Sequence, residues 1–159
     1  MESFYQSMLS TIRKYPFLMQ ALINFTKYIP IITFIIYPLV IIFLLITNND
    51  LLVPTIIRPA ASFFIVTIFR KIVNRKRPYE AMAIEPLLSH KHGESFPSRH
   101  TVSAFAIALA CLNVSWLLGI IMIVLAIIVS SSRILCGVHY ISDVLAAIII
   151  AIIIAFIKI

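Results

Sequence analysis

Charge is scarce in this sequence: 12% of its 159 residues are charged, whereas 62% are hydrophobic. A soluble domain normally carries about a quarter charged residues, so water is excluded as the main solvent for most of this surface. Long uncharged runs point the same way, and the segment from Tyr28 to Thr47 is the clearest of them. A helix of roughly 20 residues crosses a hydrocarbon core about 30 Å thick. The sequence therefore predicts an integral membrane protein.

Cysteine is also scarce, and the two cysteines, Cys111 and Cys136, both lie in apolar sequence. This favours small packing residues over a disulfide or a metal pair. The net charge of +7 could suggest a nucleic acid partner, but no soluble domain is expected that would carry such a surface. In membrane proteins, Lys and Arg gather at the interfaces or at sites for anionic substrates. We expect membrane lipids and an anionic substrate as partners, and no nucleic acid.

The N-terminal segment, residues 1–24, lacks the apolar stretch of a cleavable signal, because Glu2, Arg13 and Lys14 interrupt it. Its apolar residues instead fit a helix that lies in the membrane interface. Pro16 is expected to kink or divide this helix.

Five crossing helices can be placed in the rest of the chain. Asn113, Ser115 and Trp116 divide an apolar run that is too long for one crossing. The crossings are expected at about Tyr28–Thr47, Pro54–Phe69, His100–Leu112, Trp116–Ser132 and Tyr140–Ile157. The predicted fold class is an all-α integral membrane bundle of about five transmembrane helices plus an N-terminal interfacial helix, in a single domain covering residues 1–159.

A long polar stretch, residues 70–99, separates the second and third crossings and holds most of the charges. If the helices alternate in direction, this stretch and the turn after the fourth crossing lie on the same side of the membrane. Topology alone then brings one set of polar residues together, namely Arg70, Arg77, Ser98, His100, Arg133, His139 and Asp143.

His139 and Asp143 are four residues apart, so that on a helix they share a face. A carboxylate that accepts a hydrogen bond from one imidazole nitrogen leaves the other nitrogen free. That free nitrogen can attack phosphorus and form a phosphohistidine. Taken alone, the pair could equally be a buried structural contact.

The remaining members of the set fit the same reaction. His100 is the candidate general acid for the departing oxygen, and Arg77 and Arg133 can bind the phosphoryl oxygens in pairs. Ser98 begins a helix, where free backbone N–H groups form an anion site. Together these residues predict phosphoryl transfer to histidine, with no metal and no other cofactor.

At this point the sequence resembles the type 2 phosphatidic acid phosphatase superfamily, the lipid phosphate phosphatases. That family has three ordered motifs: Lys, six residues, Arg-Pro; then Pro-Ser-Gly-His; then Ser-Arg, five residues, His, three residues, Asp. The third motif is matched in full, the second has Arg in place of Gly, and the first has Arg in place of Lys. The matching residues are Arg70, Arg77-Pro78, Pro97-Ser98-Arg99-His100, Ser132-Arg133, His139 and Asp143, with Lys71 one position from the expected Lys.

The resemblance implies His139 as nucleophile, Asp143 as its orienting partner and His100 as acid. It also implies a set of phosphate-binding residues, namely Arg70 or the neighbouring Lys71, Arg77, Ser98, Arg99 through its backbone, and Arg133. Arg99 adds bulk and charge where the family has Gly, which could alter the preferred headgroup or favour a diphosphate. Family members typically have six crossings, against the five found here.

Other polar groups have plainer interpretations. Arg75 and Lys76 are expected to be interface charges that meet anionic lipid, and Arg58 a snorkelling or packing residue. The run His90-Lys91-His92 lacks the partner spacing of a metal site, which favours a solvated loop. Tyr79 and Glu80 could border the headgroup or simply pack in the loop.

The expected function is hydrolysis of a lipid phosphate or diphosphate: an undecaprenyl-type diphosphate, phosphatidic acid or phosphatidylglycerol phosphate. A lipid phosphotransferase, or a transporter or lipid-binding protein with a dead site, is the alternative. The protein is expected to be a multi-pass protein of the cell membrane. A simple count of basic residues places the site in the cytoplasm, whereas the family resemblance implies the extracytoplasmic face, which we favour.

Overall fold

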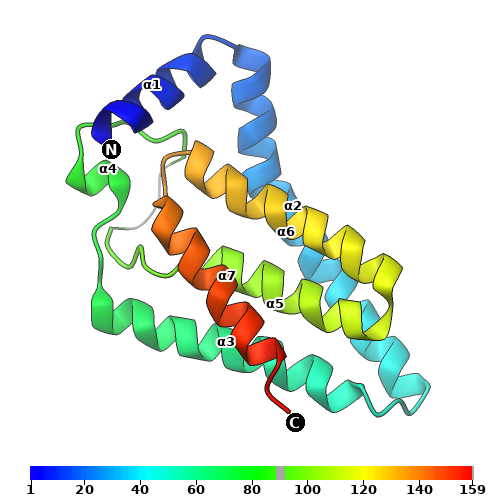
Figure 1. Cartoon of the computed structure of the whole chain (residues 1–159). Coiled ribbons are helices and arrows are strands. Elements are labelled where there is room, and N and C mark those ends of the chain that lie inside the picture. The colour runs from blue at the N-terminus through cyan, green and yellow to red at the C-terminus, as the bar shows by residue number, and fades with distance from the viewer. Residues whose placement is uncertain (89–91, 159) are drawn as a thin grey trace.

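The computed structural model describes residues 1–88 and 92–158, and in these residues it contains seven helices and no strand (Figure 1). The helices are α1 (Glu2–Arg13), α2 (Pro16–Ile46), α3 (Leu52–Val73), α4 (Pro78–Ala81), α5 (Arg99–Val114), α6 (Trp116–Leu135) and α7 (Ile141–Ala155). The predicted all-α bundle is confirmed.

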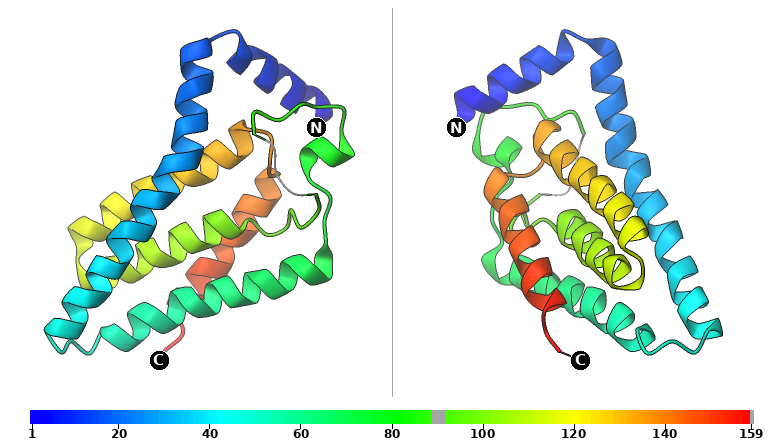
Figure 2. Two further views of the ribbon diagram at one scale, coloured as in Figure 1. Left: turned by 180° about the vertical axis from the view of Figure 1, so that it is seen from behind. Right: turned by 45° about the vertical axis from the view of Figure 1, so that its right-hand side comes forward.

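Helix α5 is the centre of the bundle, with α3, α6 and α7 packed around it and α2 lying against α6 (Figure 2). Its buried face carries small residues, among them Ala104, Ala106 and Ala108. Ala106 packs in one cluster with Val66 of α3 and with alanines of α7. Small side chains let helices approach closely in a membrane, where no hydrophobic effect drives them together. This packing fixes the ends of α3, α5 and α7 relative to one another.

The outer surface of the bundle is apolar. Helices α2, α3 and α6 are long and apolar enough to cross a membrane, while α5 and α7 are shorter apolar helices of 16 and 15 residues. At 1.5 Å per residue, these two are only about 24 Å long. Exposed Ile, Leu and Phe side chains cover the outward faces of the three long helices. Such a surface is stable against lipid tails and not against water.

The N-terminal helix is shorter than the predicted segment of residues 1–24. Pro16 divides it, as expected: α1 ends at Arg13, and Pro16 is the first residue of α2. Proline is favoured at this position, because the first N–H groups of a helix have no partner within it. Residues 16–24 therefore belong to α2 and not to an interfacial segment. Helix α1 packs through Ile12 against Cys136 and Val138, in the connection between α6 and α7.

The polar stretch between α3 and α5 is shorter than the predicted 70–99, because Arg70 lies in the last turn of α3 and Arg99 is the first residue of α5. Asn74 ends α3 in a left-handed conformation with φ 41°. The connection passes through the short helix α4 and returns to the bundle at Ser98. It joins α1, α7 and the start of α5 at one end of the bundle.

Candidate active site

The predicted set of polar residues collects at one end of the bundle. Arg70 Nη1 donates to the carbonyl of Pro97 at 3.0 Å, and Arg77 Nη1 donates to the carbonyl of Val138 at 3.3 Å. These contacts join α3 and the following connection to the segments that carry Ser98 and His139. A polar cavity of about 370 Å³ lies between them, lined by Arg70, Arg77, His92, Gly93, Glu94, Arg99, His100 and His139.

His139 and Asp143 contact one another directly: His139 Nδ1 is 3.3 Å from Asp143 Oδ2, and both side chains are buried. They do not share a helical face, because His139 lies before α7 begins. Asp143 stands in the first turn of α7 and accepts a hydrogen bond from the backbone N–H of Tyr140 at 3.0 Å. The carboxylate thus caps the helix and reaches back to the imidazole at the same time.

The surroundings of Asp143 decide which nitrogen of His139 carries the proton. Ser95 Oγ donates to Oδ2 of Asp143 at 2.5 Å, and Arg75 Nη1 donates to Oδ1 at 2.8 Å. An ionised carboxylate only accepts hydrogen bonds. His139 therefore presents Nδ1–H to Asp143, and its Nε2 keeps a lone pair. Because His139 lines the polar cavity, that lone pair is available to an electrophile bound there.

The charge state of His139 follows from its burial. Burial lowers the pKa of His139 to about 4, against the opposing effect of the hydrogen bond with Asp143, while Arg77 and Arg70 add to the lowering. A neutral imidazole is thus the dominant form at physiological pH. Only this form has a lone pair with which to attack phosphorus.

Arg70 and Arg77 supply buried positive charge to the cavity. Nε of Arg77 donates to the carbonyl of Gly93 at 3.1 Å, and Nη2 of Arg70 pairs loosely with Glu94 at 3.7 Å. Within the described residues, Nε of Arg70 has no hydrogen-bond partner. Burial lowers the pKa of Arg77, while Tyr79 and Glu80 act in the opposite direction. Buried cations with incomplete partners favour an anionic ligand.

The start of α5 forms the other wall of the cavity. Ser98 Oγ accepts hydrogen bonds from Thr101, from N–H at 3.5 Å and from Oγ1 at 3.0 Å, and the backbone N–H of Ser98 donates to the carbonyl of Asp143. With its acceptor capacity used, the Ser98 hydroxyl still has its own hydrogen to donate. Arg99 and His100 follow, and both line the polar cavity.

Three predicted phosphate-binding residues, Lys71, Ser98 and Arg133, are not among the described residues that line the polar cavity. Lys71 is exposed on α3 and is not part of the lining, because it lies one residue beyond Arg70 and so faces another direction around the helix. Arg133 is buried near the end of α6, and its Nη2 donates to the carbonyl of Thr26 in α2. Its own carbonyl accepts hydrogen bonds from the N–H groups of Val138 and His139. Arg133 thus shapes the segment that carries His139.

Three further residues contact the site and were not identified from the sequence. Ser95 and Arg75 bind Asp143, although Arg75 was interpreted as an interface charge. Tyr5 of α1 donates a hydrogen bond from its hydroxyl to the carbonyl of His139 at 3.1 Å. Ser95 lies two residues before the second motif, which is a weak signal; nothing in the sequence links Tyr5 to a residue 134 positions away.

Glu80 links distant parts of the connection between α3 and α5. Its carboxylate accepts hydrogen bonds from the backbone N–H groups of Arg77 and Gly93, both at 2.8 Å, and lies 3.1 Å from Nδ1 of His92. Burial raises the pKa of Glu80, but these hydrogen bonds outweigh it and the pKa is lowered overall. Glu80 therefore packs in the loop and holds two parts of the cavity wall. His90 and Lys91 lie outside the described residues.

Comparison with known proteins supports the motif reading. The sequence model of the PAP2 superfamily matches residues 52–158. Undecaprenyl-diphosphatase BcrC from Bacillus subtilis (strain 168) is 39% identical over 80 residues, which is 50% of this chain and 42% of that protein. The match therefore spans less than half of that relative's length.

Two solved structures share the fold. One is LpxE from Aquifex aeolicus, with a TM-score of 0.76 and 24% identity over 96% of this chain and 90% of that one. The other is the first transmembrane PAP2 type phosphatidylglycerolphosphate phosphatase from Bacillus subtilis, with a TM-score of 0.72 and 19% identity over 98% of this chain and 80% of that one. At these identities the likeness concerns the fold.

Proposed function

The chain belongs to the PAP2 superfamily, and from this premise we propose that it hydrolyses a lipid phosphate or diphosphate through a phosphohistidine at His139. The observation that carries the proposal is the His139–Asp143 pair, which borders a cavity lined by Arg70 and Arg77. A neutral nucleophile next to fixed positive charge is the arrangement that phosphoryl transfer requires.

In the first step, Nε2 of His139 attacks phosphorus, and the bond from phosphorus to the leaving oxygen breaks. Asp143 stabilises the imidazolium character that develops on His139, since its carboxylate is 3.3 Å from Nδ1. Arg70, Arg77 and the Ser98 hydroxyl bind the phosphoryl oxygens. His100 donates a proton to the leaving oxygen.

In the second step, water attacks the phosphohistidine and releases inorganic phosphate. His100 is now deprotonated, so it takes a proton from that water. Its role is the reverse of its role in the first step, with water in the place of the leaving group. His139 returns to its neutral form with Nδ1–H still facing Asp143. No step uses a metal ion.

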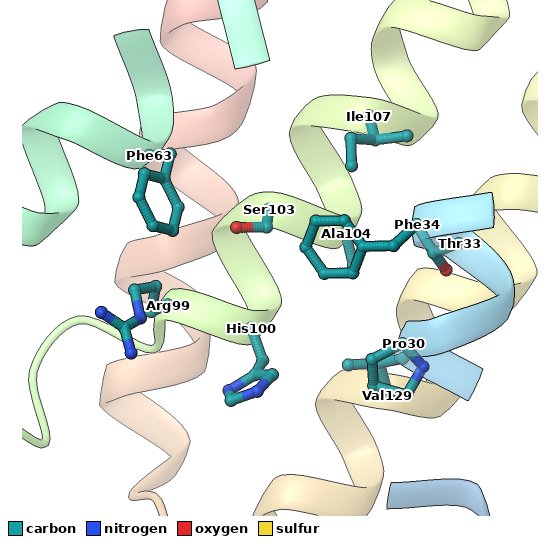
Figure 3. A pocket seen from close by; sticks show the side chains of 10 residues that line it. All are labelled: Pro30, Thr33, Phe34, Phe63, Arg99, His100, Ser103, Ala104, Ile107 and Val129. Atoms are coloured by element: carbon teal, nitrogen blue, oxygen red, sulfur yellow. The ribbon is translucent and has the colours of Figure 1, made fainter. Parts of the chain in front are cut away.

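Apolar cavities next to the site support a lipid substrate. One of about 80 Å³ lies between α2, α3, α5 and α6, and its lining includes Phe34, Phe63 and Ile107 together with His100 (Figure 3). A second of about 320 Å³, lined largely by α2 and α3, shares these three apolar residues. A lipid tail can occupy this apolar region and remain in the bilayer while its headgroup enters the polar cavity.

The substrate class is drawn from the relatives and from the charge of the cavity. The partial match to an undecaprenyl-diphosphatase favours a polyprenyl diphosphate. The shared fold with a phosphatidylglycerolphosphate phosphatase keeps phosphatidylglycerol phosphate and phosphatidic acid as candidates. All three combine an apolar tail with an anionic headgroup.

The proposal is tested by phosphate release from these lipids, presented in detergent micelles to the purified full chain in EDTA. We expect release by the wild type and none by His139→Ala. Wild-type protein quenched in alkaline detergent should retain phosphate in a linkage that is stable to base and is then lost on acidification. Normal turnover by His139→Ala, or a strict requirement for a divalent cation, would refute the mechanism.

We further propose that the protein crosses the membrane several times with the site on its extracytoplasmic face. Ala83→Cys places a thiol on the exposed connection beside the site, and Asn49→Cys places one in the turn between α2 and α3, at the other end of the bundle (Figure 1). Both native cysteines are buried. An impermeant maleimide applied to intact cells should label Ala83→Cys alone; labelling of Asn49→Cys alone would reverse the orientation.

A further inference from the structure

We propose that Arg99 binds the phosphate that stays on the lipid, so that the site is built for a lipid diphosphate. This inference rests on the proposed phosphatase function and extends it from a substrate family to one class. It assigns the guanidinium of Arg99 a separate subsite from the one at Arg70 and Arg77.

Arg99 stands where the polar and apolar cavities meet. It is the first residue of α5, and it lines both cavities together with its neighbour His100. Figure 3 shows both residues at the apolar cavity. The guanidinium carbon lies 5.7 Å from the centre of the Phe63 ring, which belongs to the apolar cavity. A ligand that passes from the apolar cavity towards His139 therefore passes Arg99 and His100 on its way.

The three arginines of the polar cavity differ in how they are held. Arg70 and Arg77 donate to backbone carbonyls and so keep fixed positions beside His139. Arg99 is exposed, and in the part of the chain that the structure describes it forms no ion pair. Its contact with Phe63 leaves the N–H donors at the edge of the guanidinium available. Arg99 is thus a third cation of the polar cavity. Its N–H donors are available to a ligand, and it also borders the apolar cavity.

The described lining of the polar cavity also carries a net positive charge. It holds Arg70, Arg77 and Arg99, while Glu94 is the acidic residue in the described lining and pairs with Arg70. Two arginines remain after this pairing. A diphosphate carries more negative charge than a monophosphate, and it spreads that charge over a greater length. Arg99 also borders the apolar cavity, whereas Arg70 and Arg77 do not, and this arrangement matches such an elongated anion.

In the first step, Arg99 stabilises the phosphate of the leaving group. When Nε2 of His139 forms its bond to the terminal phosphorus, the bond to the bridging oxygen breaks and its electron pair stays on that oxygen. His100 supplies the proton, and the leaving group is the lipid monophosphate. Its phosphate gains charge as the bond breaks, so a cation beside it stabilises the transition state more than the ground state. With a monophosphate substrate the leaving group is an alcohol, which offers Arg99 no phosphate to bind.

The test compares two lipids that differ by one phosphate. Purified full chain is given farnesyl diphosphate or farnesyl monophosphate in detergent micelles, and kcat/KM is measured from phosphate release. Arg99→Gln removes the charge and keeps length and helix propensity, and Arg99→Lys keeps the charge. Lys27→Gln, which removes an exposed cation from α2, is the matched control. Thermal unfolding of each variant reports whether the bundle is intact.

We expect Arg99→Gln to lower kcat/KM for the diphosphate by at least about tenfold, the usual cost of a charge-assisted hydrogen bond, and for the monophosphate by less than about threefold. Arg99→Lys should recover part of the loss, and Lys27→Gln should change neither substrate. Equal losses on both lipids, or no loss on the diphosphate, would overturn the assignment of Arg99 while leaving the phosphatase intact. Failure of the wild type to release phosphate from either lipid would instead refute the proposed function.

Discussion

Arg75 and His139 bind opposite oxygens of one carboxylate: Arg75 Nη1 donates to Oδ1 of Asp143 at 2.8 Å, and His139 Nδ1 lies 3.3 Å from Oδ2. Arg75 is itself held by the ring of Tyr140, 3.9 Å from its guanidinium carbon, and by Ser142 Oγ at 2.8 Å. A carboxylate held at both oxygens cannot rotate freely. The direction in which the imidazole points is therefore set in part by Arg75, which occupies one of the six variable positions between Arg70 and Arg77 in the first motif.

Loss of Arg75 should slow the chemistry more than it weakens binding. In Arg75→Gln we expect kcat to fall by about tenfold with KM changed by less than about threefold, because Asp143 loses a charge-assisted hydrogen bond and Arg75 is not in the cavity lining. Steady-state phosphate release measures both constants. Lys76→Gln, an exposed neighbour, is the control. A rise in KM with unchanged kcat would place Arg75 in substrate binding instead.

Removal of the charge on Asp143 should be far more damaging. Asp143→Asn keeps the shape of the side chain, but its amide can turn NH₂ towards Nδ1 and stabilise the wrong tautomer of His139. We expect kcat to fall by about 10³-fold or more, in line with the loss of other orienting carboxylates. The protein should still fold and bind a non-hydrolysable lipid phosphonate, measured by calorimetry. A variant with more than a tenth of normal kcat would show that the pair is structural.

Phosphoenzyme formation should persist to an unusually low pH. His139 must be neutral to attack, and its pKa is about 4, below the ordinary value near 6.5. Lowering the pH from 7 to 5 therefore leaves the nucleophile unprotonated, and activity that depends on His139 should be lost only as the pH falls towards 4. The measurement is single-turnover phosphoenzyme formation against pH. Loss of phosphoenzyme with a midpoint near 6.5 would indicate a solvated imidazole.

Tyr5 should contribute to the stability of the site from α1. Burial raises the pKa of Tyr5 to about 12, so its hydroxyl remains a donor to the His139 carbonyl. Tyr5→Phe keeps the ring and leaves that buried carbonyl without this partner, at a cost of about 1–3 kcal/mol. Thermal unfolding in detergent should show a lower midpoint than in the exposed control Tyr15→Phe. Equal midpoints would mean that α1 is not anchored at His139.

The sequence predicted those parts of the fold that depend on one segment at a time. The apolar runs gave five helices, and Asn113 to Trp116 marked the break between α5 and α6, where Ser115 separates them. The membrane solvent makes this possible, because each helix must satisfy its own backbone hydrogen bonds. Because successive crossing helices alternate in direction, the sequence alone also placed His100, His139 and Asp143 at the same end of the bundle.

The parts that the sequence did not predict depend on side chains from distant segments. Residues 16–24 extend α2, because Pro16 starts a new helix and does not merely bend an old one. Arg75 resembled Lys76 in sequence, yet only Arg75 meets Tyr140 and Asp143. Lys71 matched the family pattern as nearly as Arg70, but rotation by one residue around α3 turns it away from the cavity. Which of two neighbouring basic residues reaches the site depends on the direction of its side chain around the helix and on tertiary packing. The spacing of residues in the sequence does not reveal either.

The contact of Tyr5 with His139 also bears on how the protein is made. The two residues are 134 positions apart, so α1 leaves the ribosome well before the segment that carries its partner. Until His139 has been synthesised, α1 lacks the carbonyl to which the Tyr5 hydroxyl donates. Unfinished nascent chains cannot hold the nucleophile in place, which delays catalysis until insertion is complete.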